Sequence, residues 1–426
     1  MHDAVVIGAG HNGLVAANVL ADAGWSVLVV EAENEPGGAV RSGELIEPGY
    51  VNDRFSAFYP LAAASPVFRA LGVQIPFRHG PLVLAHPSLD GTTAVLSRNP
   101  AETTMGASWP AAMERWERIE PALLRGLATP FPQVRSALML ALEPGAAKLL
   151  RLRPDRLADR LLLGNALHTD VPPRSLLGRA FALLLTAFGQ RYGFPCVEGG
   201  SGRLTELLVD RAAARGVEVR LGERLDRLPT ARHAVLAAID TWELARITGR
   251  RSHVERDPAT VKLDWTLDGP VPWTSEPARL APVVHLGGER DFVLFGQYSM
   301  VDPTRSPPGK ETAWAYSHVL SAAEIEAQIE RHAPGFGALV RGRRLEELPA
   351  GRVNLGTARW RNQLVLRPFH GRPATGLRNV YLASASAHPG GGVHGAAGWI
   401  AAQAALRSVS RRRRARGLAS LTISST

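Results

Sequence analysis

The chain has 426 residues, of which 45% are hydrophobic and 21% are charged, a composition typical of globular proteins rather than disordered or fibrous ones. Its length exceeds what one hydrophobic core usually organises and therefore predicts two domains. The formal net charge of +10 at pH 7 comes almost entirely from arginines spread along the sequence, which argues against a nucleic-acid-binding element, because basic residues would cluster there.

The first forty residues predict a dinucleotide-binding βαβ unit. Ala4–Ile7 is a continuous apolar run that suits a buried parallel strand, and residues 26–30 form a second such run. Gly8, Gly10 and Gly13 place the pattern G-x-G-x-x-G between the first strand and a helix expected over residues 12–23. The free N–H groups at the start of that helix would favour a phosphate without any basic side chain.

Each residue of this motif has its own function. Gly8 allows the tight turn, Gly10 lets the backbone approach a pyrophosphate, and Gly13 lets the helix pack closely on the sheet. Glu31 closes the second strand about twenty residues further on, where a carboxylate accepts hydrogen bonds from a ribose. A coincidental turn is the alternative, but strand, glycines, helix and acid all occur in register.

Gly37, Gly38 and Arg41 follow Glu31 in the pattern E-x-x-x-x-x-G-G-x-x-R. This pattern resembles the second signature of flavoproteins of the glutathione-reductase type, and the resemblance implies that the nucleotide is FAD. The only cysteine, Cys196, excludes a disulfide, a cysteine-based metal cage and the redox pair of disulfide reductases. We interpret it as a small buried residue, with a reactive thiol as the alternative.

The middle of the chain predicts a second domain. Residues 53–71 suggest a loop and a short helix near the flavin, and the turn signals of residues 77–96 suggest a hairpin. Apolar residues at three-to-four spacing predict helices over 111–127, 133–142, 146–152, 156–163 and 176–188. Arginines beside their apolar faces are expected at the surface of a packed helical layer, with a membrane-facing patch as the alternative.

The chain then returns to the nucleotide domain. A glycine-rich turn, a helix over 203–215, strands at 217–221 and 234–238 and a helix at 240–248 indicate this return. Four later runs read as strands separated by turns and predict a four-stranded antiparallel sheet, at 261–267, 282–286, 292–299 and 312–319. A helix is expected at Ala322–His332.

The last unit repeats the arrangement of the first. A strand over 380–384, glycines at 390–392 and a helix over about 396–409 again direct a helix N-terminus at an anion or a polar ring edge. Arg407, Arg416 and residues 411–414 form a basic run that we expect to be a solvated tail, with contact to anionic lipid as the alternative. Apolar runs such as 181–188 are too short to cross a bilayer, and no signal peptide is evident, so we expect a cytoplasmic protein, with membrane association as the alternative.

Four segments resemble the phytoene dehydrogenase and carotenoid desaturase-related FAD oxidoreductases, within the amine-oxidase-like flavoprotein superfamily. They are IGAGHNGLVAANVL with EAENEPGGAVRS, EGGSGRLTELL, VKLDWTLDGPVPW with VDPTRSPPGKETAWAYSHV, and YLASASAHPGGGVHGAAG. The resemblance implies an α/β fold whose FAD/NAD(P)-binding domain is Rossmann-like, of the glutathione-reductase type, beside an α+β substrate domain with an antiparallel sheet. We expect the FAD domain at 1–65, 190–250 and 345–410, the substrate domain at 66–189 and 251–344, and a basic tail at 411–426.

The chain departs from these relatives in two places. The segments at 228–234 and 346–362 are shorter than in the relatives, so the FAD domain is trimmed. Ser384 and Ala385 stand where many members of the superfamily have G-D, so a carboxylate that would meet the cofactor is missing.

Together the motifs and the resemblance indicate the site residues. The expected cofactor-binding residues are Gly8, Gly10, Asn12, Gly13, Glu31, Ala32, Gly37, Gly38, Arg41, Val219, Ser384, Gly391, Gly392 and Val393. His394 is the expected catalytic residue, because it follows the glycine turn expected beside the isoalloxazine; a structural or solvated histidine is the alternative. The sequence holds no metal-ligand cluster, and we expect no metal site.

These features predict an FAD-dependent oxidoreductase of the desaturase or dehydrogenase type. It would transfer hydride between flavin and a small apolar substrate, such as an isoprenoid or a polyene. Hydride transfer to a flavin needs no acid–base pair, which agrees with the lack of any catalytic constellation other than the flavin motifs. A flavin-dependent isomerase without net redox change and a non-catalytic flavin-fold binding protein remain the alternatives.

Overall fold

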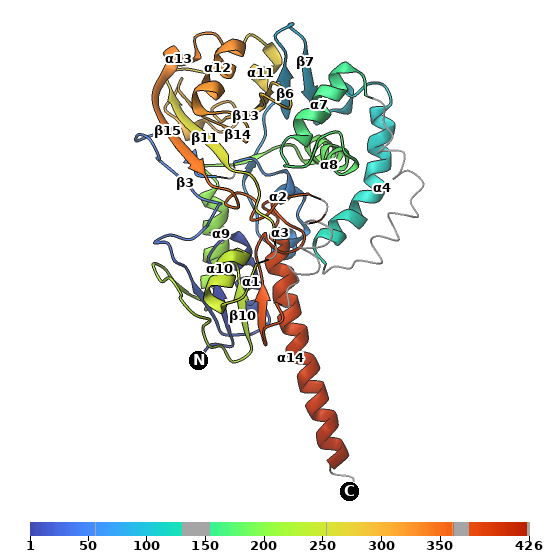
Figure 1. Cartoon of the computed structure of the whole chain (residues 1–426), viewed down its shortest axis with the longest axis vertical. Coiled ribbons are helices and arrows are strands. Elements are labelled where there is room, and N and C mark those ends of the chain that lie inside the picture. Colours follow the sequence, from blue (N-terminus) through green and yellow to red (C-terminus); the bar gives the residue numbers. More distant parts are fainter. Residues whose placement is uncertain (56, 130–153, 253, 360, 362–374, 424–426) are drawn as a thin grey trace.

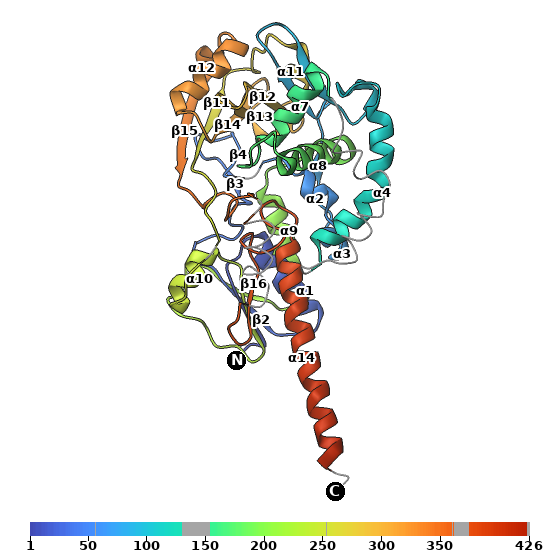
Figure 2. The ribbon, with the colours of Figure 1, turned by 45° about the vertical axis from the view of Figure 1, so that its right-hand side comes forward.

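The computed structural model describes residues 1–426 except 56, 130–153, 253, 360, 362–374 and 424–426, and for residues 413–423 it describes the backbone alone. The molecule has two bodies, one built on a parallel sheet and one on a larger mixed sheet (Figure 1). Helix α14 (Ala396–Ile423) begins in the first body and extends away from both, as the turned view in Figure 2 also shows.

The first body is a five-stranded parallel sheet in the order β16-β10-β1-β2-β9. Its strands are β1 (Ala4–Ile7), β2 (Val27–Val30), β9 (Glu218–Arg220), β10 (Ala234–Ala237) and β16 (Val380–Leu382). In the central strand, Ala4 pairs with Val27 of β2 and with Ala234 of β10. Every residue of β1, β2 and β10 is buried, as parallel strands covered on both faces require. This confirms the predicted Rossmann-like fold.

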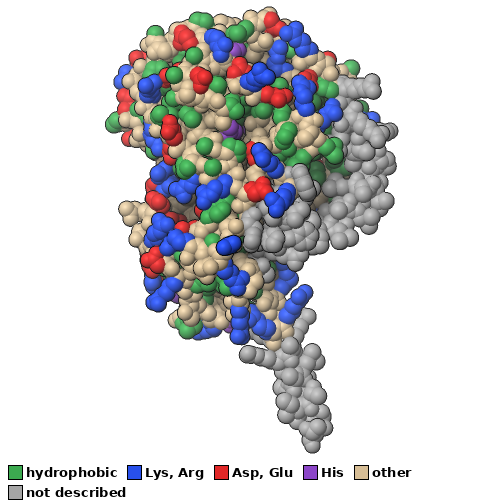
Figure 3. All heavy atoms as spheres, in the orientation of Figure 1, with side chains coloured by type: hydrophobic (Ala, Val, Ile, Leu, Met, Phe, Trp, Pro, Cys, Tyr) green, Lys and Arg blue, Asp and Glu red, His purple; other side chains and the backbone are tan. Residues whose placement is uncertain are grey.

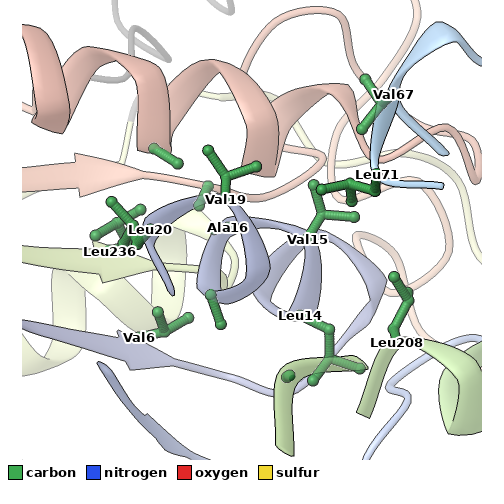
Figure 4. Packing of buried hydrophobic residues seen from close by; sticks show 14 of the residues in the cluster. Val6, Leu14, Val15, Ala16, Val19, Leu20, Val67, Leu71, Leu208 and Leu236 are labelled. Atoms are coloured by element: carbon green, nitrogen blue, oxygen red, sulfur yellow. The ribbon is translucent and has the colours of Figure 1, made fainter. Parts of the chain in front are cut away.

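Helices cover this sheet, with α10 in a separate apolar core from the other three. They are α1 (His11–Asp22), α9 (Gly202–Ala213), α10 (Thr241–Thr248) and the first turns of α14. Val6 and Leu236 point from the sheet toward α1, whereas Val19 lies between α1 and α14 (Figure 4). The boundaries expected from the sequence differ from the observed ones by one or two residues at most of these ends.

The second body is a seven-stranded sheet in the order β15-β11-β14-β13-β12-β6-β7. Its strands are β6 (Leu84–Pro87), β7 (Thr93–Leu96), β11 (Thr260–Leu267), β12 (Val283–Leu286), β13 (Val293–Gln297), β14 (Glu311–Ser317) and β15 (Val340–Leu348). The four predicted strands form its centre. The expected hairpin is β6 with β7, and it joins the sheet because β6 pairs in parallel with β12.

Strand β15 corrects the sequence prediction at one domain boundary. We had expected the FAD domain to resume at residue 345, but residues 340–348 pair with β11 as an edge of the seven-stranded sheet, with Leu263 opposite Leu345. Side chains of this strand alternate between partly buried and exposed positions, and most of them are charged. Because a solvent-facing edge strand needs little apolar character, its sequence lacked the pattern by which we recognised the other strands.

Helical layers cover both faces of the larger sheet. On one face lie α4 (Trp109–Leu127), α7 (Arg156–Ala166) and α8 (Leu176–Tyr192), and on the other lie α11 (Glu276–Leu280), α12 (Ala322–His332) and α13 (Phe336–Leu339) (Figures 1 and 2). Each face has its own apolar core. The helices expected at 133–142 and 146–152 lie outside the described residues.

Short elements connect the two bodies. A two-stranded ribbon joins β3 (Ser42–Gly43) to β4 (Asn52–Asp53), and another joins β5 (Phe77–Arg78) to β8 (Cys196–Val197). Between them lie the short helices α2 (Pro60–Ala64) and α3 (Pro66–Ala70); the 3-10 turns are η1 (Pro100–Glu102) and η2 (Pro303–Arg305). The residues expected to form a loop and short helix near the flavin thus form two helices, separated at Ser65 before Pro66.

Helix α14 also differs from the prediction. We had expected it to end near residue 409 and a solvated tail to follow, but its backbone is helical to Ile423. Arg411 is exposed, whereas Arg412 is half-buried and donates to Asn379 Oδ1 at 2.7 Å. Arginine is a strong helix former, so a basic run with no proline or glycine in its first residues can continue a helix. No helix in the described part of the chain is both long and apolar enough to cross a membrane.

Candidate cofactor and active site

The glycines after β1 are required by the packing of strand and helix. Gly8 has φ +97°, and a Cβ placed there would lie 2.9 Å from the carbonyl oxygen of Ala238 at the end of β10. A Cβ on Gly13 would lie 2.1 Å from the carbonyl oxygen of Gly8. At Gly10, by contrast, a Cβ would meet nothing within 4 Å. The open space in front of α1 is therefore at Gly10, where the sequence predicts the pyrophosphate.

A second helix N-terminus lies beside the first. A Cβ on Gly398 of α14 would lie 1.9 Å from the carbonyl oxygen of Asn12, so the two helices touch through their backbones. The Gly398 N–H also donates to Asn12 Oδ1 at 3.4 Å. Asn12 is also an expected cofactor-binding residue; in the structure its side-chain oxygen bonds the start of α14, and its role toward the cofactor stays a prediction.

The carboxylate of Glu31 is held at the end of β2 by two backbone donors. The Ala9 N–H donates to Oε2 at 2.6 Å and the Glu33 N–H donates to Oε1 at 2.9 Å. Each oxygen keeps lone pairs for ribose hydroxyls. Ala32 is exposed beside it, and Val219 pairs with Val29 on the neighbouring strand, so both expected residues flank this carboxylate.

The second glycine pair lies directly against the first motif. Gly37 donates its N–H to the carbonyl oxygen of Ala9 at 2.9 Å, and a Cβ on Gly38 would lie 3.3 Å from the Cα of Gly10. Arg41 is buried; its Nε donates to the carbonyl oxygen of Gly38 at 2.9 Å and its guanidinium pairs with Glu35 at 2.9 Å. Arg41 thus braces this turn.

The C-terminal glycine turn closes the site from the side of β16. Ser384 is buried and its Oγ accepts the N–H of Ser386 at 3.3 Å. A Cβ on Gly391 would lie 2.6 Å from Asn354 Oδ1, and a Cβ on Gly392 would lie 2.5 Å from Leu61 Cδ1 of α2. The next residue, Val393, is buried in the core of the first body. The turn is therefore fixed between α2 and the segment around residue 354.

His394 was expected to be catalytic, but its ring is committed to the backbone. Its Nδ1 accepts the N–H of Ala396 at 3.1 Å, and the carbonyl groups of Gly390 and Gly391 also interact with the ring. Burial, with the nearby His11, lowers the pKa of His394 to about 3. A histidine that is neutral at pH 7 and bonded in this way positions the start of α14, and the geometry favours that role over acid–base catalysis.

His11 is a site residue that the sequence analysis missed. It follows Gly10 as the first residue of α1, and its Nε2 is buried without a hydrogen-bond partner in the part of the chain that the structure describes. Burial lowers the pKa of His11 to about 4, so the ring is neutral at pH 7. The signal was a polar residue inside the glycine motif, at a position that the motif leaves unspecified.

These observations test whether a dinucleotide cofactor fits. Space opens at Gly10, two helix N-termini meet there, and the Glu31 carboxylate lies at the end of the neighbouring strand β2. The His11 ring hydrogen-bonds the Gly392 backbone, while its Nε2 has no hydrogen-bond partner among the described residues. The residues fit FAD, with Gly10 at the pyrophosphate, Glu31 at the ribose, and Gly391 and Gly392 on the side of the flavin ring.

A buried ionic network joins this site to the seven-stranded sheet. The fully buried Arg305 pairs with Asp53 at 3.0 Å and with Asp302 at 3.1 Å. The Tyr298 hydroxyl donates to Asp53 at 2.7 Å, and burial raises the pKa of Tyr298 well above its usual 10, so it stays a donor. Asp53 in turn accepts the N–H of Ser201 at 2.8 Å. The sequence analysis missed these residues because they are far apart in the chain.

Apolar side chains connect the glycine turn to the second body. Leu61 of α2 contacts the turn, and the neighbouring Phe58 stacks on Tyr298 with ring centroids 5.6 Å apart. The ring centroid of Trp314 lies 6.0 Å from that of Phe58 and 6.0 Å from that of Tyr316. These residues belong to the apolar core between the sheet and α4, α7 and α8.

Two further expectations concern metal and thiol chemistry. Among the described residues, no three His, Cys, Asp or Glu side chains are arranged to hold a metal ion. Cys196 is buried, and burial raises the pKa of its thiol to about 12, which agrees with a small buried residue rather than a reactive thiol.

Comparison with known proteins adds a family to this geometry. A model of the family described as flavin containing amine oxidoreductase matches residues 13–246, more than half of the chain. The pyridine nucleotide-disulfide oxidoreductase domain-containing protein 2 of Mus musculus is 23% identical over 551 aligned positions, which cover 96% of this chain and 94% of that protein. Phytoene dehydrogenase of Streptomyces griseus is 28% identical, over 68% of this chain and 61% of its own length.

Solved structures show the same fold. Cyclohexylamine oxidase from Brevibacterium oxydans superposes with a TM-score of 0.58 at 16% identity, covering 96% of this chain and 99% of that one. Putrescine oxidase bound to putrescine superposes with a TM-score of 0.60 at 15% identity, with the same coverage. The fold is that of the FAD-dependent amine oxidases. The family match and the fit of the site residues identify the cofactor as FAD.

Proposed function

Because the chain belongs to the flavin containing amine oxidoreductase family, we propose that it is an FAD-dependent dehydrogenase or desaturase of an apolar, isoprenoid- or polyene-like substrate. The observation that carries this proposal is the apolar packing that links the C-terminal glycine turn to the second body. Leu61 contacts Gly392 directly, and Phe58 and Trp314 continue this surface into the core of the second body.

The titratable groups at the turn support the same proposal. His11 and His394 have pKa values lowered to about 4 and about 3, so neither carries a charge at pH 7. A cationic amine would need a carboxylate or a similar partner near the turn, because an unpaired buried charge is strongly disfavoured. An apolar chain makes no such demand.

The chain's residues would divide the work between binding and exclusion of water. Bound FAD supplies the two-electron acceptor. The glycines and Glu31 would hold the nucleotide. The ionic network around Arg305 would fix the position of the seven-stranded sheet relative to it. Leu61 and Phe58 would exclude water and align an apolar substrate with the flavin ring. Desaturation would remove from adjacent carbons of the substrate a hydride, which goes to the bound two-electron acceptor, and a proton, which is released to solvent, leaving a C=C bond.

Anaerobic reduction of the flavin tests this proposal. Polyenes and isoprenoids should bleach the flavin absorbance of the holoenzyme, primary amines should not, and oxygen or a quinone should restore the colour. Leu61→Ser should slow bleaching without releasing flavin, because it places a hydroxyl among the apolar side chains beside the C-terminal glycine turn. Bleaching by amines alone would overturn the proposal. Product formed without bleaching would indicate isomerisation.

We also propose that α14 brings the protein to anionic membranes, where an apolar substrate would be dissolved. The helix extends from the body, Arg407 and Arg411 are exposed on it, and basic side chains gather where it leaves the body (Figure 3). Each arginine near an anionic surface would contribute about 1 kcal/mol, less as salt rises.

Co-sedimentation with liposomes tests the role of this helix. The full chain should sediment with anionic but not neutral liposomes at low salt, and a chain ending at Val409 should sediment less. Equal sedimentation of both chains at every salt concentration would contradict a role for residues beyond 409.

A further inference from the structure

The two edge strands of the seven-stranded sheet differ in whether their outward backbone groups are hydrogen-bonded. At the β7 edge, the Thr104 N–H donates to the carbonyl oxygen of Val95 at 2.9 Å, and the Val95 N–H donates to Thr104 Oγ1 at 2.8 Å. A loop thus occupies the outward backbone groups of β7. At the β15 edge, the described residues show no backbone hydrogen bond to the nine residues of the strand except those from β11 and the bond from the Val340 N–H to the carbonyl oxygen of Gly337 at the end of α13. Unprotected edges of this length invite another strand.

The free edge of β15 is long and lies on the outside of the molecule. Figures 1 and 2 both show it as the outermost strand of its sheet. The contacts described between the loop after β3 and this strand fall on its first residues, where Arg341 pairs with Glu47 and Gly342 faces Ile46. The stretch from Arg343 to Leu348 follows them. Leu345, at its centre, is 48% exposed.

The sequence of this stretch is complementary to itself. Residues 343–347 read Arg-Arg-Leu-Glu-Glu, so the charges change sign on either side of Leu345. In an antiparallel pairing centred on Leu345, Arg343 lies opposite Glu347 of the partner subunit, and Arg344 lies opposite Glu346 of the partner subunit. The twofold axis repeats both pairs. Shifting the centre by one residue, to Arg344, would instead place two arginines opposite each other.

Three of these four charged residues already form ion pairs within the single chain, and Arg344 also reaches Asp264 at 3.4 Å. Arg343 is 60% exposed and pairs with Glu326 on α12 at 2.9 Å. Arg344 pairs with Glu346 of its own strand at 2.5 Å, so a second copy would extend this pair into a ring of four charges. Glu347 is exposed and makes no ion pair with any residue that the structure describes. Of the four charged residues at 343–347, it is the one without an ion pair among the described residues.

We propose that β15 is a homodimerisation edge, at which two copies pair antiparallel about Leu345 and join their sheets into one. Directly opposed ion pairs on a sheet contribute about 0.2–1 kcal/mol each, and backbone hydrogen bonds along a strand of roughly 30 Å add to them. The apolar Leu345 side chains meet at the axis. This inference does not depend on the substrate proposed above.

Charge reversal tests the pairing and its register. Glu347→Arg places like charges opposite each other twice per dimer and should raise the dimer dissociation constant at least about tenfold, measured by sedimentation velocity over a range of concentrations. Adding Arg343→Glu exchanges the two charges and should restore dimerisation. Glu114→Arg, on the distant helix α4, is the matched control and should change nothing. A monomeric wild type, or no rescue by the double variant, would overturn the proposal.

Cross-linking tests the contact at the axis. Leu345→Cys places two thiols opposite each other in the dimer, and the native Cys196 is buried and should not react. A short bismaleimide should give a covalent dimer from Leu345→Cys. Leu89 is a 64% exposed residue on the turn between β6 and β7, and Leu89→Cys should give no covalent dimer under the same treatment. Equal cross-linking of both variants, or none at Leu345→Cys, would contradict the proposed interface.

Discussion

In the parallel sheet, the central strands β1, β2 and β10 contain apolar residues alone, and the groups that serve the cofactor are glycines, backbone atoms and one carboxylate at the strand ends. The seven-stranded sheet instead buries charges within its strands. Lys262 pairs with the fully buried Asp264, and Arg344 reaches the same carboxylate at 3.4 Å. Burial raises the pKa of Asp264, which shows what its environment costs the ionised form.

The difference follows from what each body does. The first must let a nucleotide approach its backbone. It therefore has glycines at positions where the backbone of another element or the cofactor lies too close for a side chain. The second must hold its position over the first, and buried ion pairs with many partners define one arrangement, although they add little net stability. The two bodies should therefore respond differently to substitution.

The largest effect is expected from breaking the ionic network. Arg305→Met leaves Asp53 and Asp302 buried without their cation and should lower the free energy of unfolding by about 3–5 kcal/mol, measured by urea denaturation. Arg174→Met is the control, because Arg174 is 69% exposed in its pair with Asp159 and should contribute at most about 1 kcal/mol. Equal losses in both variants would contradict a special role for the network.

Substitution of two neighbouring glycines should separate stability from cofactor binding. Gly13→Val forces a side chain against the Gly8 carbonyl and should destabilise the protein by about 1–3 kcal/mol or more. At Gly10 an added Cβ meets no protein atom within 4 Å, so a Gly10→Val protein should fold normally but bind no FAD, because the side chain occupies the space of the pyrophosphate. Urea denaturation and the flavin spectrum report the two effects. A Gly10→Val protein with stoichiometric flavin would refute the site.

Loss of the ribose carboxylate should have a smaller effect. Glu31→Ala removes charge-assisted hydrogen bonds to the ribose with a total net value of about 1.5–3 kcal/mol, so the dissociation constant of FAD should rise roughly tenfold to hundredfold. Glu31→Gln keeps an oxygen for the Ala9 N–H and separates the loss of charge from the loss of that bond. An FAD affinity unchanged in both variants would remove Glu31 from the site.

Buried neutral histidines should also make the second body sensitive to acid. His86, His168 and His285 lie together, with the facing ring nitrogens of His168 and His285 2.7 Å apart. Burial lowers the pKa of His86 to about 4 and of His168 to about 3, and lowers that of His285 well below 6.5. Below pH 6.5 the unfolded chain binds protons that the native state does not, so stability is present above pH 6.5 and falls as the pH drops toward 4.

The slope of this acid effect gives the test. Each such histidine should contribute about 1.4 kcal/mol per pH unit within that window. Denaturation at pH 7.5, 6.5, 5.5 and 4.5 should show the decline, and His168→Phe should make it shallower. Arg160 and His332 face His86 and disfavour its protonation, and His318 acts on His168 in the same way. A slope that stays the same in the variant would show that other groups cause the decline.

The elements and the cofactor-site motifs of the first body could be predicted from the sequence. The strand, the glycines, the helix, Glu31 and the Gly37–Gly38 turn all lie within about forty residues, and each is required by local packing or by approach of the cofactor, so their spacing carried the prediction. The C-terminal turn was recognisable for the same reason. The family and the cofactor followed from these local signals.

The remaining features depend on contacts between segments that are far apart in the chain. The Asp53–Arg305 pair joins residues 252 positions apart, and neither residue type in isolation indicates burial. Strand β15 is charged because it is an edge, and β6 joins the sheet through parallel pairing with β12, which no turn signal encodes. His394 and Asn12 both bond the start of α14, because α1 and α14 meet there. Such contacts depend on which segments meet in space, and spacing along the chain does not record that.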